Sequence, residues 1–314
     1  MLSALEKGEQ KIRVPGVMHK KEGTLHYTPA SQDYFEKYIF PAILPPSLKE
    51  STIFNLISVE GCPYQCTFCN VTPIIKRKLR YRNLEQVIQE IKLVLEQTPN
   101  PPLFSFIDEA FVLNKERVLQ FCSLLKEKNL KINWDCYGRI NCMKPDLMLK
   151  MKEAGCVSIF YGIEAGSNNI LTKIKKEFTI EAALRVAVES TNYFKRVTTS
   201  FIWGYPYETI HDFGRTLLAI RYLKQNGVAT QLKLLSPVKG TELFDEYRES
   251  LIDAMDNEMP TEFYPITCEP VEIQDFIQDN KNLFLRYRAF PTPDRAKKLG
   301  LIESIGSIPI PLQG

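Results

Sequence analysis

The regular alternation of short β-rich runs with amphipathic helical patterns restricts the fold of this chain more than any other feature. Six such runs lie at residues 53–59, 103–107, 132–136, 157–163, 197–203 and 230–235. Successive βα units favour a parallel sheet, which right-handed crossovers curl toward a barrel. Because an eight-stranded barrel needs two further units, we predict an α/β fold built on a partial (β/α)6 barrel. A doubly wound open sheet is the alternative.

Helix ends within this region carry their own signals. Gly155 is placed to cap the carboxyl end of the third helix. Thr209 and Asp212 form a capping-box pattern at the start of the fifth helix. Either sheet architecture binds ligands at the carboxyl ends of its strands, so residues that directly follow a strand are the candidate functional residues.

The chain divides into three regions that differ in how regularly strand and helix patterns alternate. Residues 1–50 form an irregular N-terminal extension, with a small hairpin predicted around Glu22 and Gly23. Residues 51–236 hold the predicted barrel. Residues 237–314 form a C-terminal extension, with helices predicted at 243–247 and 276–287, which we expect to cover the mouth of the barrel.

Composition narrows the class of protein. The chain has 314 residues, of which 44% are hydrophobic and 25% charged, values that exclude wholesale disorder. No apolar run is long enough to span a bilayer, and the polar N-terminus does not match a signal peptide. We therefore expect a soluble, cytoplasmic protein with no membrane partner. A net charge of +3 is too small to indicate nucleic acid.

Three cysteines follow the first predicted strand in the segment GCPYQCTFCN. Cys62, Cys66 and Cys69 have the spacing C-x3-C-x2-C. Eight cysteines in a chain without a secretory signal favour metal ligands, reactive thiols or core residues over disulfides. Three thiolates on one short loop are typical ligands of an iron–sulfur cluster. They leave one iron of a 4Fe–4S cluster open to a small molecule.

A zinc site is the first alternative for these cysteines. Zinc takes four ligands, usually from paired C-x2-C units, and its fourth ligand here would come from Cys136, Cys142 or His211. Three structural cysteines of the core are the second alternative. The proline and polar residues between the cysteines fit a loop better than a packed core.

The cysteine spacing resembles the signature of the radical SAM enzymes, C-x3-C-x-aromatic-C, with Phe68 in the aromatic position. The resemblance implies a partial (β/α)6 barrel, a 4Fe–4S cluster held by the three cysteines, and S-adenosylmethionine bound to the open iron. It also implies a one-electron donor such as flavodoxin or ferredoxin. The expected activity is reductive cleavage of S-adenosylmethionine to a 5′-deoxyadenosyl radical, which abstracts hydrogen from an unactivated C–H bond.

The same resemblance implies further binding residues near the strand ends. Asp108 or Glu109 is the acid expected beside the methionine amino group, although an acid here also suits the cap of a turn. Arg139 resembles the arginine that pairs with the methionine carboxylate, which its guanidinium fork matches. A structural ion pair is the alternative role for Arg139.

The fourth and fifth strands add three residues to this set. Glu164 resembles the carboxylate that accepts hydrogen bonds from the ribose. Gly204 and Pro206 lie in a G-x-P-x-E-T turn expected beside the adenine, and Glu208 is expected to help start the following helix.

The run from residue 150 to 247 resembles the branch that contains cobalamin-dependent radical SAM enzymes, and residues 11–50 resemble the linker that follows the cobalamin domain there. Only about 50 residues precede the predicted barrel, too few for a cobalamin domain, and His19, His26 and His211 lie in contexts unsuited to binding it. We therefore expect cobalamin only in trans, from a partner chain, unless the enzyme works without it or the chain is a fragment. Methylthiotransferases fit less well, because no close cysteine pair remains for a second cluster.

Substrate and reaction are less constrained. We expect a small-molecule or peptide substrate that undergoes rearrangement, epimerisation, dehydrogenation or cross-linking. Radical methylation with cobalamin supplied in trans is the alternative, and a zinc or iron–sulfur module with a structural or regulatory role is the non-enzyme alternative. Cys142 and Cys268 are candidate hydrogen donors to a substrate radical, whereas Cys122 and Cys156 are expected in the core.

A basic run follows the cysteine loop. It suits attraction of an acidic substrate to the barrel mouth, or simply a solvated face with contacts to the next helix. Its members are Lys76, Arg77, Lys78, Arg80 and Arg82.

Overall fold

The computed structural model describes residues 18–21, 23–28, 43–71, 74, 78–109, 111–254, 271–281 and 283–306. Its centre is a parallel sheet of six strands in the order β10-β9-β8-β7-β6-β3. The strands are β3 (Ile53–Leu56), β6 (Leu103–Phe106), β7 (Asn133–Gly138), β8 (Cys156–Glu164), β9 (Arg196–Trp203) and β10 (Ala229–Leu234). This confirms the predicted α/β fold with six parallel strands.

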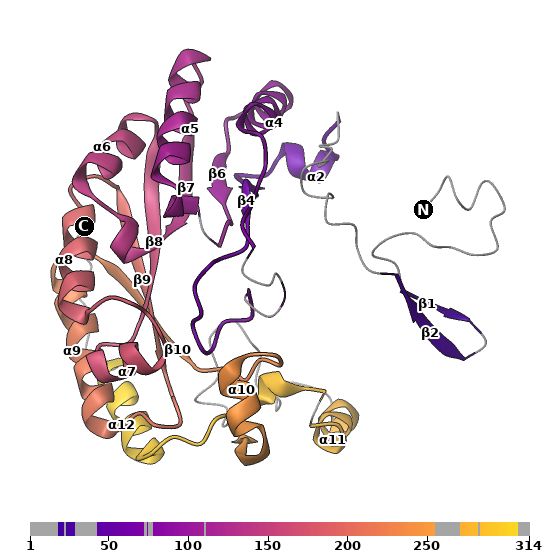
Figure 1. The fold of residues 1–314 in the computed structure, drawn as a ribbon, viewed down its shortest axis with the longest axis vertical. Helices are drawn as coiled ribbons and strands as arrows, with labels where there is room; N and C mark the ends of the chain where they lie inside the picture. Colours follow the sequence, from indigo (N-terminus) through magenta and orange to yellow (C-terminus); the bar gives the residue numbers. More distant parts are fainter. Residues whose placement is uncertain are drawn as a thin grey trace.

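The order of the strands excludes the doubly wound alternative. A doubly wound sheet reverses its strand order at a switch point, whereas here the six strands follow one another in chain order from β3 to β10. Crossovers of one hand then place the connecting helices on one side of the sheet, as Figure 1 shows. They are α4 (Leu84–Gln97), α5 (Lys115–Glu127), α6 (Pro145–Glu153), α7 (Asn168–Lys173), α8 (Ile180–Ser190) and α9 (Ile210–Gln225).

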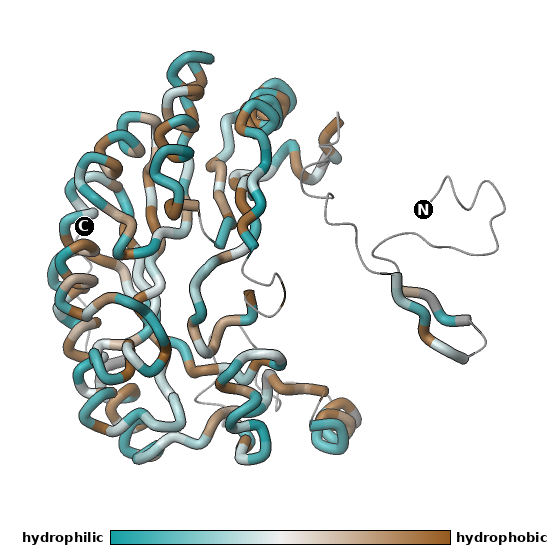
Figure 2. Tube along the Cα trace, in the orientation of Figure 1, coloured by the Kyte–Doolittle hydropathy of each residue, from teal (hydrophilic) through white to brown (hydrophobic). Residues whose placement is uncertain are grey.

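The main core lies between these helices and the sheet. Alternate residues of β3, β6 and β7 are buried on the helix side, including Phe54, Phe104 and Trp134. Phe106 packs its ring edge-on against Phe121 of α5 at 5.2 Å. In Figure 2 the outer helices alternate between hydrophilic and hydrophobic residues, as helices with one buried face must. The opposite face of the sheet, called the inner face below, carries the less buried residues of each strand.

The first predicted strand is divided. Residues 53–59 were expected to form one strand, but β3 ends at Leu56 and a separate strand, β4 (Val59–Glu60), pairs antiparallel with β5 (Arg80–Tyr81). Ser58 lies between them, and its backbone N–H and hydroxyl both donate to Asp108, at 2.6 Å each. This buried carboxylate replaces a neighbouring strand as the partner of the Ser58 amide, so the chain leaves the sheet here.

Smaller elements flank the sheet. The predicted hairpin is present as β1 (Met18–Lys21) and β2 (Thr24–Tyr27), with Gly23 at φ +81° in its turn. A short helix, α2 (Pro46–Lys49), precedes β3. Short 3-10 helices lie at Phe111–Leu113, Ile140–Cys142, Arg248–Ser250 and Leu285–Tyr287. Within the described ranges, every helix is too short or too polar to cross a bilayer.

The C-terminal region contains α10 (Glu242–Tyr247), α11 (Val271–Asp279) and α12 (Arg295–Gly306), with a two-stranded sheet of β11 (Ile252–Asp253) and β12 (Arg288–Ala289). The single helix predicted at 276–287 is wrong. The helix ends at Asp279, where the side-chain amide of Asn280 donates to the carbonyl of Phe276 at 2.8 Å. Asparagine and aspartate compete with the helical backbone for hydrogen bonds, which favours a helix end here.

The predicted caps are confirmed, whereas the prediction for Glu208 is wrong. Thr209 and Asp212 form a reciprocal capping box at the start of α9, and Gly155 follows α6 at φ +91°. Glu208 does not start the helix. Its carboxylate accepts from the Gly204 amide at 3.0 Å and from Lys298 of α12, also at 3.0 Å, with both side chains fully buried.

Lys298 joins the C-terminal helix to the turn that follows β9. Its ammonium also donates to the Glu208 carbonyl and to the Thr292 hydroxyl, both at 2.6 Å. Burial raises the pKa of Glu208, and the Lys298 charge opposes that rise. Because both charges are withdrawn from water, each depends on the other for its stabilisation.

We predict that Lys298→Met lowers the free energy of unfolding by about 3–5 kcal/mol, because it leaves Glu208 charged, buried and without its cation. The double variant Glu208→Gln with Lys298→Met should recover part of that loss. Chemical denaturation measures both, with the exposed Lys297→Met as the control. Equal stability of Lys298→Met and Lys297→Met would contradict a structural role for the buried pair.

Candidate active site

The three cysteines lie on one loop at the carboxyl edge of the sheet. This cysteine loop, residues 61–71, follows β4. The Cys69 amide donates to the Cys66 carbonyl at 3.1 Å, which closes a turn between two of the cysteines. The Leu243 amide of α10 donates to the Thr67 carbonyl at 3.0 Å. The loop is therefore fixed both by its own turn and by the C-terminal region.

The surroundings of the sulfurs suit thiolates that carry a metal cluster. Burial raises the pKa of Cys62 and of Cys69, while hydrogen bonding from the backbone at Tyr64 and Val71, respectively, lowers each. The charge of Cys66 also raises the pKa of both thiols. Cys66 therefore lies close enough to interact electrostatically with Cys62 and with Cys69. A metal cluster would compensate the charge that burial disfavours.

Two cations face the cysteine loop, Arg139 from directly after β7 and Lys176 from the segment between α7 and α8. The charge of Arg139 lowers the pKa of Cys62, and that of Lys176 lowers the pKa of Cys69. No three His, Cys, Asp or Glu side chains within the described residues gather closely enough to hold a single metal ion. Three thiolates on one loop match the ligands of an iron–sulfur cluster, whereas a structural zinc site takes four protein ligands.

Asp108 and Glu109 both contact the chain that leads into the cysteine loop. Asp108 is fully buried and binds Ser58 through both carboxylate oxygens. Burial raises the pKa of Asp108 to about 6, although the hydrogen bonds from Ser58 oppose the rise. Within the described ranges, Glu109 accepts one hydrogen bond, from the Gly61 amide at 3.2 Å. Asp108 is therefore committed to the backbone, and the Glu109 carboxylate keeps acceptor capacity for a ligand.

Glu164 ends β8 in a conformation that few residues adopt. Its φ is +76°, in the left-handed region, and the pairing of β8 with β9 is irregular between Gly162 and Glu164. A Cβ atom at residue 162 would collide with the Glu164 carboxylate, so glycine is required there. Strained backbone conformations of this kind are concentrated at functional sites. Here the conformation turns the Glu164 side chain back toward the end of its own strand.

Lys176 and Ser200 hold the Glu164 carboxylate. The Lys176 ammonium donates to Glu164 Oε1 at 3.2 Å and to the Gly162 carbonyl at 3.0 Å, while the Ser200 hydroxyl donates to Oε2 at 3.0 Å. Sequence reasoning missed both residues. The available signal was a basic residue in the loop after Glu164 and a serine three residues before the end of a strand, and neither is distinctive without the fold.

Arg139 follows β7 and bridges two loops. Its guanidinium stacks on the Tyr64 ring of the cysteine loop, 3.3 Å from the ring centroid, and donates to the Lys176 carbonyl at 2.8 Å. Its closest carboxylate contact is with the exposed Glu177, at 4.0 Å. The alternative of a structural ion pair for Arg139 is therefore weak, and its charge faces the cysteines.

The turn after β9 packs against the cysteine loop. Gly204 has φ +94°, and a Cβ there would approach Leu234 to 2.8 Å. The following Tyr205 is fully buried, packs edge-on against Phe68 at 6.4 Å, and has no hydrogen-bond partner for its hydroxyl within the described part of the chain. Pro206 lies in the same turn, half-buried. The structure thus brings the predicted Phe68, Gly204 and Pro206 segments together.

The remaining cysteines divide as follows. Cys122 and Cys156 are buried, as predicted, and burial raises the pKa of Cys122 to about 12. Cys142 is half-buried, and burial raises its pKa, while Tyr64 and Arg139 oppose that rise. Because Tyr64 belongs to the cysteine loop, Cys142 lies beside that loop. Cys268 lies outside the described residues.

The basic run does not act as one patch. Arg80 pairs with Glu60, and the buried Arg82 pairs with Glu90, each at 2.5 Å. Lys78 is exposed. Lys76 and Arg77 lie outside the described residues. Attraction of an acidic substrate therefore stays a prediction for Lys76, Arg77 and Lys78, whereas Arg80 and Arg82 are already paired.

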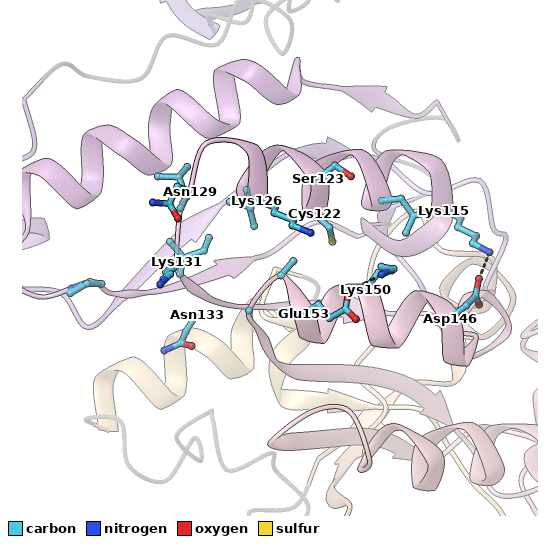
Figure 3. Close-up of a pocket in the computed structure, with 17 residues that line it drawn as sticks. Lys115, Cys122, Ser123, Lys126, Asn129, Lys131, Asn133, Asp146, Lys150 and Glu153 are labelled. Carbon is cyan, nitrogen blue, oxygen red and sulfur yellow. Dashed lines mark hydrogen bonds and ion pairs between the residues drawn. The ribbon is translucent and has the colours of Figure 1, made fainter.

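A cavity lies away from the carboxyl edge of the sheet. It has a volume of about 1110 Å³ and runs between α5 and α6 toward the amino end of β7. Figure 3 shows the Lys115–Asp146 pair at one end of it and Asn129 and Lys131 at the other. The cavity lies between the outer helices and away from the cysteine loop, so the candidate site is not placed in it.

Comparison with known proteins identifies the family. The model of the radical SAM superfamily matches residues 56–230, more than half of the chain. The chain belongs to the radical SAM superfamily and is an enzyme of that class, whose cofactors are a 4Fe–4S cluster and S-adenosylmethionine.

Relatives include methyltransferases and a cyclase. An uncharacterized methyltransferase of Pyrococcus horikoshii is 27% identical over 253 residues, covering 78% of this chain and 54% of the relative. An anaerobic magnesium-protoporphyrin IX monomethyl ester cyclase of Rubrivivax gelatinosus is 26% identical over 263 residues, covering 82% and 45%. The chain thus spans about half the length of the curated relatives it matches.

Solved structures share the fold. The radical S-adenosylmethionine methyltransferase TsrM of Kitasatospora setae, with cobalamin and a 4Fe–4S cluster bound, superposes with a TM-score of 0.73 at 15% identity, covering 98% of this chain and 65% of TsrM. The cobalamin-dependent radical enzyme OxsB superposes with a TM-score of 0.67 at 17% identity, covering 97% of this chain and 48% of OxsB. These likenesses support the predicted branch at the level of fold.

We predict that Asp108→Asn changes how stability depends on pH. An acid whose pKa is higher in the folded than in the unfolded chain loses stabilising free energy as pH rises through the interval between the two values. For Asp108 that interval runs from 3.8 to about 6. The wild type should therefore lose up to about 3 kcal/mol relative to Asp108→Asn between pH 4 and pH 7. Denaturation across this range measures the difference, and parallel curves for the two proteins would contradict it.

Proposed function

We propose that this protein cleaves S-adenosylmethionine reductively at the carboxyl edge of its sheet and uses the resulting radical on an unactivated C–H bond of its substrate. The observation that carries the proposal is the placement of three half-buried cysteines beside two cations and the strained Glu164 carboxylate. When bound, the cluster and S-adenosylmethionine supply a 5′-deoxyadenosyl radical. Reduction requires a one-electron donor such as flavodoxin or ferredoxin.

Residues of the chain have distinct roles in this proposal. Cys62, Cys66 and Cys69 bind the cluster, and Phe68 packs behind it. Glu164 accepts hydrogen bonds from the ribose hydroxyls, with its carboxylate oriented by Ser200. Arg139 and Lys176 supply positive charge for the methionine carboxylate.

The two acidic residues after β6, Asp108 and Glu109, have different roles in this proposal. Glu109, whose carboxylate has a single backbone donor, receives the methionine amino group. Asp108 instead positions the cysteine loop through Ser58. Gly204 and Pro206 shape the turn beside the adenine.

Two further assignments follow from position. Cys142 is the hydrogen-donor candidate that lies next to the cysteine loop, as its side-chain hydrogen bonding with Tyr64 indicates. We also propose that the C-terminal extension, predicted over residues 237–314, covers the barrel mouth. The hydrogen bond from Leu243 to Thr67 and the burial of Lys298 against Glu208 support that assignment.

Radical methylation is the second candidate function. Methyltransferases are among the relatives, and the folds of TsrM and OxsB, both solved with cobalamin bound, match almost the whole chain. In this case cobalamin would be held by a partner chain or by residues outside this sequence. Methylation also yields S-adenosylhomocysteine, whereas rearrangement, epimerisation, dehydrogenation and cross-linking yield none.

We predict that Cys66→Ala abolishes cluster binding and 5′-deoxyadenosine formation. The protein is purified without oxygen, reconstituted with iron and sulfide, and given S-adenosylmethionine and dithionite. The wild type should hold about four iron atoms per chain and form 5′-deoxyadenosine, detected by mass spectrometry. Cys142→Ser, outside the motif, is the control that should keep its iron. A full iron complement in Cys66→Ala would overturn the assignment.

We predict separately that Glu164→Gln weakens binding of S-adenosylmethionine by about tenfold, because a hydrogen bond to a charged acceptor becomes a neutral one. Calorimetry on the reconstituted protein measures the Kd, while the iron content should stay at the wild-type value. The exposed Glu153→Gln on α6 is the control. An unchanged Kd for Glu164→Gln would remove Glu164 from the binding site.

A further inference from the structure

One row of polar side chains crosses the inner face of the sheet below the active-site edge. The register pairs Asn55 with Ser105, Ser105 with Asp135, Asp135 with Ser158, and Ser158 with Arg196. Five neighbouring strands therefore contribute one polar residue each at the same height. The residues that alternate with them, such as Trp134 and Val197, are buried beneath the outer helices.

Part of this row lines a cavity of about 180 Å³. Thr198, Gln231, Tyr137 and Phe160 complete the lining together with Ser105, Asp135, Ser158 and Arg196. Four of the polar side chains in it have no hydrogen-bond partner among the described residues, namely Ser158, Arg196, Thr198 and Gln231. Thr198 is buried, Ser158 and Gln231 are half-buried, and Arg196, the first residue of β9, is exposed. Their donors and acceptors face a cavity open to solvent, where they can receive a polar ligand.

The two charged residues of the cavity attract each other without a direct ion pair among the described residues. Asp135 and Arg196 lie two strands apart in the row, which separates their Cα atoms by about 10 Å. Burial raises the pKa of Asp135, and the hydrogen bond from Ser105 and the charge of Arg196 oppose that rise. Asp135 accepts one hydrogen bond, from Ser105 at 2.6 Å. The cavity thus offers a negative acceptor on one side and a positive, forked donor on the other, which matches a ligand that carries both charges.

An apolar surface leads from this cavity toward the active-site edge. Tyr137 and Phe160 pack edge-on at 5.3 Å on the inner face. Tyr137 is 46% exposed, and Ile107 at the end of β6 is 41% exposed. Along β9, Thr198 of the cavity lies two residues, about 7 Å, before Ser200, which holds Glu164. The inner face therefore carries polar side chains at the cavity and the apolar rings of Tyr137 and Phe160 between the cavity and Glu164.

We propose that this cavity binds the α-carboxylate and α-ammonium groups of an amino-acid substrate, which would identify the substrate class of the proposed radical chemistry. Arg196 and Gln231 donate to the carboxylate, and Asp135 accepts from the ammonium. The side chain of the ligand lies along Tyr137 and Phe160 and reaches toward Glu164. This assignment rests on the proposed function, because only a substrate below the radical site would be positioned for hydrogen abstraction.

Calorimetry on the reconstituted protein with S-adenosylmethionine tests the proposal. The probes are the twenty proteinogenic L-amino acids, followed by the N-acetyl and carboxamide derivatives of any that bind. We expect at least one amino acid to bind and both of its derivatives to bind at least about tenfold more weakly, since each removes one charge. Arg196→Gln should also weaken binding of the amino acid by at least about tenfold. Asp135→Asn should weaken the amino acid similarly but leave its N-acetyl derivative unchanged.

Lys195→Gln is the matched control, because it removes one exposed positive charge next to Arg196 in sequence without altering the cavity lining. It should keep wild-type affinity. Binding of none of the amino acids, or equal affinity for inorganic phosphate and an amino acid, would overturn the proposal. The proposed function is tested independently by iron content and 5′-deoxyadenosine formation, so either can fail while the other stands.

Discussion

The consecutive order of six parallel strands is the constraint on which the rest of this structure depends. Because the order never reverses, crossovers of one hand place the helices on one side and leave the other face of the sheet for ligands. All six carboxyl ends meet at one edge. Residues more than a hundred positions apart, from Cys62 to Ser200, can therefore act on one small molecule.

Charge balance organises that edge. Burial raises the pKa of Cys62 and Cys69 and so disfavours their thiolates. Backbone hydrogen bonding and the positive charges of Arg139 and Lys176 lower these pKa values. Lys176 is shared, since the same ammonium also holds the Glu164 carboxylate. The cysteine loop and the proposed ribose-binding residue are thus coupled through one side chain. A change at Lys176 should disturb both parts of the site together.

Two described parts of the C-terminal region contact loops of the candidate site. Leu243 donates to the cysteine loop, and Lys298 is buried against the turn that carries Gly204. Both contacts fix loops that, by their position after strands, contain functional residues. On the inner face, by contrast, four described polar side chains without hydrogen-bond partners line a cavity of about 180 Å³, where we propose that the substrate binds.

The sequence alone determined the alternation of strands and helices, the cysteine motif and the acid at the end of β8, because periodicity and close spacing are local properties of a chain. It misplaced the end of the first strand and the role of Glu208, since Asp108 and Lys298 act on them from 50 and 90 residues away. Lys176, Ser200 and the polar row from Asn55 to Arg196 emerged only in the tertiary structure. Register between strands and the path of loops decide which side chains meet, and no local pattern encodes either.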